Sequence, residues 1–102
     1  MIIFNTTFHV EDDVCDDYIR FMKDVYIAKA ASSGFLHEPR FLRIHAQHEN
    51  SGTSYSVQFK VKNVDTLNHW HSTEGLALQQ QLAARFGNKV AGFVTLLEEI
   101  EL

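Results

Sequence analysis

The order of two hydrophobic periods along the chain is the feature that most constrains its fold. Apolar residues alternate at every second position over residues 2–10, recur at helical spacing up to Gly34, and alternate again in two stretches before Asn63. A second helical stretch follows, and a last extended stretch runs from about Lys89 to Ile100. Alternation is typical of strands, and spacings of three and four are typical of helices. The order β-α-β-β-α-β predicts an α+β, ferredoxin-like fold.

Local residues mark the ends of these predicted elements. An aspartate within residues 11–13 is expected to cap the first helix, and Pro39 is expected to open the second strand. Asn63 can cap the second helix, which Ser72–Gly75 is expected to kink or interrupt. The segment Glu49–Gly52 has the composition of the turn between the second and third strands.

Right-handed crossovers predict an antiparallel sheet in the spatial order 4-1-3-2, with both helices on one face. The last strand is apolar on both faces, and the sequence leaves open which set of its residues meets the helices. An apolar edge strand left in water is an aggregation hazard, so two sheets are expected to pair through a twofold axis in a homodimer, a dimeric α+β barrel. The face without helices is expected to carry Ile3, Asn5, Thr7, His9, Phe41, Arg43, His45, Gln47, Ser54, Ser56, Gln58 and Lys60.

Composition narrows the class of protein. The 102 residues are expected to form a single domain, residues 1–102. The net charge is -4 and the nine basic residues are scattered, which argues against nucleic acid as a partner. No apolar run approaches the roughly 20 residues of a membrane-spanning helix. The first residues lack the pattern of a signal peptide, so a cytoplasmic location is expected.

Few residues suggest chemistry by their spacing. The single Cys15 excludes an intrachain disulfide and a multi-cysteine metal site. His45 and His48 would face opposite sides of a strand, and His69 and His71 would point in different directions on a helix. His9 and His45 could share the helix-free face, but no cysteine or acidic residue is placed to join them, so no metal is expected. There is no Gly-x-Ser-x-Gly segment and no glycine-rich phosphate loop. The catalytic residues therefore stay unknown, and whether the protein is an enzyme is left open.

A group of aromatic residues with polar ends could line a pocket between the helices and the sheet. Such a group suits a small planar or apolar ligand held by few hydrogen bonds. The alternative is an aromatic core whose polar ends reach the surface, and both interpretations stay open. The residues are Tyr18, Tyr26, Tyr55, Trp70 and His71.

Four segments resemble a small family of unknown function, DUF4286, which is found in Bacteroidetes. They are Met1–Asp12, Val25–Ile27, Trp70–His71 and Phe93–Ile100. The family has no established activity, so the resemblance implies no catalytic residues.

The chain also resembles, at the level of fold, the dimeric α+β barrel proteins. These include cofactor-independent monooxygenases of the antibiotic-biosynthesis type and haem-degrading monooxygenases. In that group an Asn on the first strand and a Trp in the second helical region line a pocket, and Asn5 and Trp70 are similar here. The haem-degrading members supply a His further along, where this chain has Gln80, so the resemblance implies no haem and no cofactor is expected.

Three hypotheses of function follow. The first is a small-molecule binding domain whose pocket is lined by Tyr26, Trp70 and His71. The second is a cofactor-independent oxygenase in which Asn5 and Trp70 position an electron-rich aromatic substrate and a His or Tyr takes its proton. The third is a structural or partner-binding module without a ligand.

Overall fold

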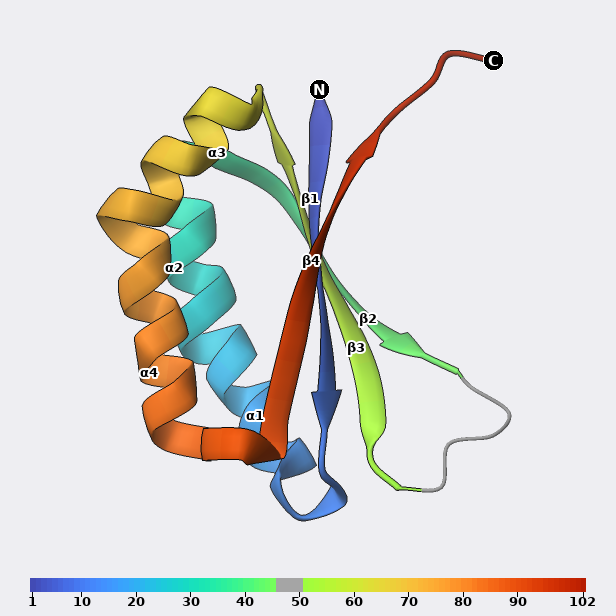
Figure 1. Ribbon diagram of the computed structural model, residues 1–102, viewed down its shortest axis with the longest axis vertical. Helices are drawn as coiled ribbons and strands as arrows, with labels where there is room; N and C mark the ends of the chain where they lie inside the picture. Colours follow the sequence, from blue (N-terminus) through green and yellow to red (C-terminus); the bar gives the residue numbers. More distant parts are fainter. Residues whose placement is uncertain (46–50) are drawn as a thin grey trace.

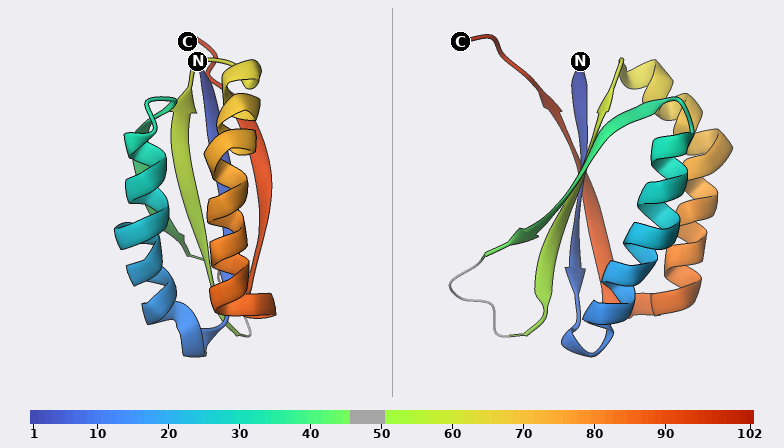
Figure 2. Two further views of the ribbon diagram at one scale, coloured as in Figure 1. Left: turned by 90° about the vertical axis from the view of Figure 1, so that its left-hand side faces the viewer. Right: turned by 180° about the vertical axis from the view of Figure 1, so that it is seen from behind.

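A computed structural model describes residues 1–45 and 51–102, and these form a sheet with two long helical arms on one of its faces (Figures 1 and 2). Its antiparallel strands lie in the spatial order β2-β3-β1-β4. The predicted α+β, ferredoxin-like fold and strand order are therefore confirmed. The strands are β1 (Ile2–Val10), β2 (Leu36–Ile44), β3 (Thr53–Val61) and β4 (Val90–Glu98).

Each helical arm contains a π-helical turn. The first arm consists of η1 (Asp12–Val14), α1 (Cys15–Phe21), the π-turn η2 (Met22–Tyr26) and α2 (Ile27–Ser32). The second consists of α3 (Val64–Trp70), the π-turn η3 (His71–Gly75), α4 (Leu76–Phe86) and η4 (Gly87–Lys89). The interruption predicted at residues 72–75 is this second π-turn. A π-turn adds one residue to a helical turn and is frequent at functional sites.

The two predicted helix caps have different outcomes. Asn63 caps the second arm as predicted, because its side-chain oxygen accepts a hydrogen bond from the Thr66 amide at 2.8 Å. The predicted aspartate cap of the first arm is wrong, since no side chain caps that start. Asp13 instead accepts a hydrogen bond from Lys89, which lowers the pKa of the Asp13 carboxyl and raises the pKa of Lys89. This contact joins the start of the first arm to the turn before β4.

Strand β2 begins at Leu36, so the prediction that Pro39 opens it is wrong. The register shifts between His37 and Arg40, which leaves Glu38 and Pro39 together opposite one residue of β3. Glu38 has a φ of 49°, which few residues other than glycine adopt. A bulge of this kind reverses the face to which every later side chain points.

The bulge corrects the predicted faces of β2. Phe41 and Arg43 were expected on the helix-free face, but they pair with Val57 and Tyr55 and lie on the helix side. The Phe41 ring lies 6.0 Å from the ring of Tyr18. Leu42 and Ile44 take their places on the helix-free face. The predictions for Gln47, His48 and the first part of the turn Glu49–Gly52 lie outside the described residues.

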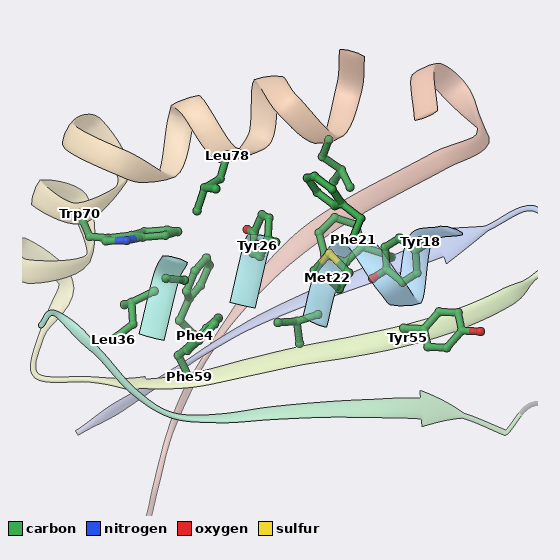
Figure 3. Packing of buried hydrophobic residues seen from close by; sticks show 14 of the residues in the cluster. Phe4, Tyr18, Phe21, Met22, Tyr26, Leu36, Tyr55, Phe59, Trp70 and Leu78 are labelled. Atoms are coloured by element: carbon green, nitrogen blue, oxygen red, sulfur yellow. The ribbon is translucent and has the colours of Figure 1, made fainter. Parts of the chain in front are cut away.

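The core lies between the helical arms and the sheet (Figure 3). Tyr18, Met22, Phe59 and Trp70 are each less than 2% exposed. Full burial of a side chain of this kind contributes about 1.5–3 kcal/mol to folding. No helix in the described part of the chain is long and apolar enough to cross a membrane.

The register of β4 answers the question that the sequence left open. Val90, Gly92, Val94 and Leu96 pair with the helix-side residues of β1. Phe93 and Leu97 stand at the alternate positions, on the helix-free face. Strand β4 lies at the edge of the sheet, and the side chains of Phe93, Val94, Leu96 and Leu97 are exposed.

Candidate functional site

A cavity of about 190 Å³ lies between the second helical arm and strands β1 and β4. Its walls are mostly apolar and aromatic, which is typical of small-molecule sites. The sheet contributes Phe4, Thr6, Phe8, Val90, Gly92, Phe93 and Val94, and the helical arms contribute Tyr26, Trp70, His71, Gly75, Gln79, Leu82 and Ala83.

Both π-turns adjoin the cavity. Tyr26 is the last residue of η2, and His71 and Gly75 are the first and last residues of η3. One extra residue rotates the following helical stripe by about 100°, since an α-helix has 3.6 residues per turn. The phase set by η3 therefore directs Gln79, Leu82 and Ala83 of α4 to the cavity.

Two glycines allow aromatic rings to lie against the backbone at the cavity. A Cβ atom at Gly75 would lie 2.6 Å from Cζ3 of Trp70. A Cβ atom at Gly92 would lie 2.6 Å from Cδ1 of Phe8. Both distances are shorter than van der Waals contact, so these positions require glycine as long as the two rings stay in place.

The polar side chains at the cavity are Thr6, Tyr26, His71 and Gln79. Burial raises the pKa of Tyr26 to about 12, so its hydroxyl stays protonated near neutral pH and can donate a hydrogen bond. Neither Lys, Arg, Asp nor Glu is among the described residues that line the cavity. The site is therefore suited to an uncharged ligand with one or a few hydrogen-bonding groups.

Trp70 forms the wall of the cavity nearest to Phe4. Its side chain is 1% exposed, and its ring packs edge-on against Phe4 with centroids 5.9 Å apart. Its indole N–H has no hydrogen-bond partner among the described residues. Figure 3 shows Trp70, Phe4 and Tyr26 between the second arm and the sheet.

Of the six residues that the sequence suggested for a ligand site, the structure brings together three, Tyr26, Trp70 and His71. Asn5 lies on the opposite, helix-free face of the sheet, although it is largely buried. Its side-chain oxygen accepts hydrogen bonds from Ser56 and from Gln58, the latter at 3.3 Å. Asn5 therefore cannot share a pocket with Trp70 in this arrangement.

Tyr18 and Tyr55, the other two suggested residues, do not line the cavity, and Tyr55 lies apart from it on the helix side. Its ring packs 5.2 Å from the ring of Tyr18, and the Arg43 guanidinium lies 5.7 Å from its centroid. Burial raises the pKa of its hydroxyl, which Arg43 partly offsets. Figure 3 shows this hydroxyl pointing away from the packed residues. Tyr55 instead lines a separate groove with Lys23 and Arg43.

Sequence reasoning missed Thr6, Gly75, Gln79 and Gly92 as cavity residues. Thr6 is the polar residue in the apolar alternation of residues 2–10, and Gly92 interrupts an apolar strand, so the sequence could have indicated both as cavity residues. Nothing in the sequence indicated Gln79, because the π-turn η3 sets the helical phase that directs this side chain to the cavity. Within residues 1–45 and 51–102, no three His, Cys, Asp or Glu side chains converge as metal ligands would.

Solved structures with the same fold cover nearly the whole chain. An antibiotic biosynthesis monooxygenase matches with a TM-score of 0.72 and 11% identity, over 99% of this chain and 100% of that one. HapK from Hahella chejuensis matches with a TM-score of 0.73 and 12% identity, over 98% and 93% of the two chains. A protein of the ethyl tert-butyl ether D (EthD) family from Bacillus halodurans C-125 matches with a TM-score of 0.74 and 12% identity, over 98% and 100%. At these identities the likeness shows the fold alone.

The sequence itself places the chain in a family. None of the curated proteins matches it in sequence. The profile described as "Domain of unknown function (DUF4286)" matches residues 1–100. The chain therefore belongs to the DUF4286 family.

Proposed function

We propose that this protein is a homodimeric domain that binds a small, uncharged aromatic molecule in the cavity between the second helical arm and strands β1 and β4. The cavity is the observation that carries the proposal, because it combines aromatic walls with four uncharged or weakly basic polar groups. An apolar cavity of about 150 Å³ holds a benzene molecule. A cavity of about 190 Å³ therefore suits a ligand of one or two rings. A cytoplasmic location and a bacterial source are part of this proposal.

The proposal is tested by native mass spectrometry of the freshly purified protein, followed by thermal unfolding with one- and two-ring phenols and ketones. Ala83 lines the cavity and neighbouring Ala84 is exposed outside it, so Ala83→Phe and Ala84→Phe form a matched pair. A ligand in the cavity is expected to raise the Tm of the wild type and of Ala84→Phe, but not that of Ala83→Phe. Equal stabilisation of both variants would place the ligand elsewhere, and no stabilisation by any compound would favour a structural or partner-binding module.

The homodimer is supported by the apolar residues of the helix-free face. Phe93 is 64% exposed and Leu97 41% exposed on this face, and Leu42 and Ile44 flank its far side. Large exposed apolar side chains at both edges of one sheet face favour an interaction site, and twofold pairing of identical faces would cover both edges.

Light scattering after size exclusion tests the dimer. Leu97→Glu would place carboxylates in the proposed interface, and it is expected to shift the protein to monomer. Val64→Glu makes the same kind of change on the exposed surface of the second arm and is expected to leave the dimer intact. A wild-type monomer at micromolar concentration would contradict the proposal.

A second candidate is a cofactor-independent oxygenase, which is favoured by the fold shared with the antibiotic biosynthesis monooxygenase and by an imidazole at the cavity. The substrate would be a phenol, which with one O2 gives a quinone and one water. His71 would take the phenolic proton, because the raised pKa of Tyr26 keeps that hydroxyl protonated. Trp70 would position the ring, while the place of Asn5 excludes it from contact with a substrate in the cavity.

Oxygen uptake with a panel of naphthols and anthrones tests this candidate. His71→Asn is expected to abolish uptake, while His69→Asn, which changes a residue packed on Phe35 outside the cavity, is expected to retain it. Equal uptake by the two variants, or none by the wild type, would rule the candidate out.

A further inference from the structure

The helical arms cover one side of the sheet, but they leave part of β4 exposed on that side. Val94 is 57% exposed and Leu96 is 44% exposed, although both pair with helix-side residues of β1. Val94 also lines the cavity. Val94 at the cavity and Leu96, two residues further along β4, therefore form an exposed apolar surface on the helix side of the strand.

The two edges of the sheet differ in how they discourage other chains from pairing. The β2 edge contains a bulge and Pro39, and His37, Glu38, Arg40 and Arg43 lie along it. Such features block pairing with a further strand. Strand β4 has neither a bulge nor a proline over Val90–Glu98, and its single charged residue is the last one. Strand β4 therefore lacks the features that discourage pairing with another chain.

Pairing of the helix-free faces alone does not cover this surface. Successive side chains of a strand point to opposite faces, so a partner on the helix-free face buries Phe93 and Leu97 but leaves Val94 and Leu96 in water. A segment of the partner must therefore reach around the β4 edge to cover them.

Residues 99–102 have the pattern and the position that such a segment needs. They leave the sheet as an extended stretch, apart from the rest of the molecule (Figure 1). Ile100 is 80% exposed and Leu102 is fully exposed, and they alternate with Glu99 and Glu101. Alternation of this kind gives one apolar side for packing and one acidic side for water.

These residues cannot cover Val94 and Leu96 of their own chain. They follow β4 directly, and a reversal of the chain takes a turn of four residues, which would use the whole segment. Fully extended, the four residues span about 13 Å beyond the end of β4. The exposed apolar surface that they could cover therefore lies on another molecule, and Val94 and Leu96 of a second copy present such a surface.

We propose that residues 99–102 of each copy in the homodimer lie over Val94 and Leu96 of the other copy and close the open flank of the cavity. This inference rests on the homodimer and the cavity of the proposed function. It adds that each ligand site is completed by a segment of the second copy.

The direct test is a mixed dimer in which one copy carries 13C-labelled methyl groups and the other is unlabelled. Intermolecular nuclear Overhauser effects are expected between the Ile100 methyl groups of one copy and the Val94 methyl groups of the other. A dimer without these contacts, or a protein that stays monomeric, would overturn the inference.

A second measurement uses 2-naphthol as the probe. The double variant Ile100→Glu and Leu102→Glu is expected to weaken 2-naphthol binding by about tenfold. The control Glu101→Gln changes the acidic side of the same segment and is expected to bind as the wild type does. Equal affinity of the double variant would overturn the inference and leave the proposed function standing. Intermolecular contacts without any binding of 2-naphthol would support the exchange of residues 99–102 while removing support for the proposed ligand.

Discussion

The indole of Trp70 occupies the space that a side chain at Gly75 would need. A Cβ atom there would lie 2.6 Å from Cζ3 of Trp70, which is well inside van der Waals contact. The two residues are five positions apart, since Trp70 directly precedes the π-turn η3 and Gly75 is its last residue. The π-turn, the glycine and the indole therefore form one unit, and this unit makes one wall of the cavity.

Gly75→Ala is expected to lower the free energy of unfolding by about 1–3 kcal/mol, because the added methyl group displaces a buried ring. In an ordinary exposed helix the same change would stabilise the protein by about 1 kcal/mol. Urea unfolding followed by circular dichroism measures the effect, with the exposed Gln80→Ala as control. A more stable Gly75→Ala protein would contradict the packing of Trp70 against this turn.

Trp70→Ala is expected to lower the free energy of unfolding by about 3–5 kcal/mol, because it removes a large buried side chain. Trp70→Phe should cost less, since it keeps a ring against Phe4 and the indole N–H has no partner to lose. Denaturant unfolding gives both values, and titration with 2-naphthol shows whether the smaller ring alters binding. A loss below about 1 kcal/mol for Trp70→Ala would show that the residue is not part of the core.

Tyr18→Phe is expected to leave the protein as stable at pH 7 or to raise the free energy of unfolding by up to about 1 kcal/mol. Its hydroxyl is buried without a hydrogen-bond partner among the described residues, and its removal relieves that desolvation. Thermal unfolding measures the change. A loss of more than 1 kcal/mol would indicate that the hydroxyl does have a partner in solution.

Stability is expected to fall as pH rises above about 10, the ordinary pKa of tyrosine. Burial raises the pKa of Tyr18 and raises that of Tyr26 to about 12, so above pH 10 the unfolded chain releases protons that the folded protein retains. The unfolded state therefore becomes more favourable as pH rises. Unfolding between pH 8 and 11 measures the slope, which should be shallower in Tyr18→Phe than in the wild type. Identical slopes would contradict a raised pKa for Tyr18.

Asn5→Ala is expected to lower the free energy of unfolding by about 1–3 kcal/mol, because it leaves the buried Ser56 hydroxyl without its acceptor. Binding of 2-naphthol, measured below the unfolding transition, should stay unchanged, since Asn5 lies on the other face of the sheet from the cavity. The double variant Asn5→Ala and Ser56→Ala removes both partners and should recover part of the stability. Selective loss of binding in a stable Asn5→Ala protein would place Asn5 at the ligand after all.

The sequence by itself determined the succession of strands and helices and, through it, the order of the sheet. Periods of two and 3.6 are local properties of the chain, and only a few connections between the elements are sterically allowed. The start of the second helical arm was also predictable, because the cap at Asn63 depends on a contact only three residues away, with the Thr66 amide. Tyr26, Trp70 and His71 were also found from the sequence, because helical phase over short distances directs them to the sheet.

Only the tertiary structure decided the faces of β2 and β4 and the contents of the cavity. The bulge at Glu38 and Pro39 moves Phe41 to the opposite face of the sheet. The position of the bulge depends on the pairing of β2 with β3, and the alternation of residues within β2 alone does not reveal it. Both faces of β4 are apolar, so only its register with β1 decides which of its residues face the helices. Asn5 resembles a pocket residue of the fold group, but it lies next to Thr6 on β1 and therefore points to the opposite face of the sheet. Thr6, between Phe4 and Phe8, is the polar β1 side chain that reaches the cavity. On β2 and β4, pairing across strands sets the direction of each side chain, and that pairing joins residues far apart in the sequence. The direction of Asn5 follows from alternation within β1, as the sequence predicted.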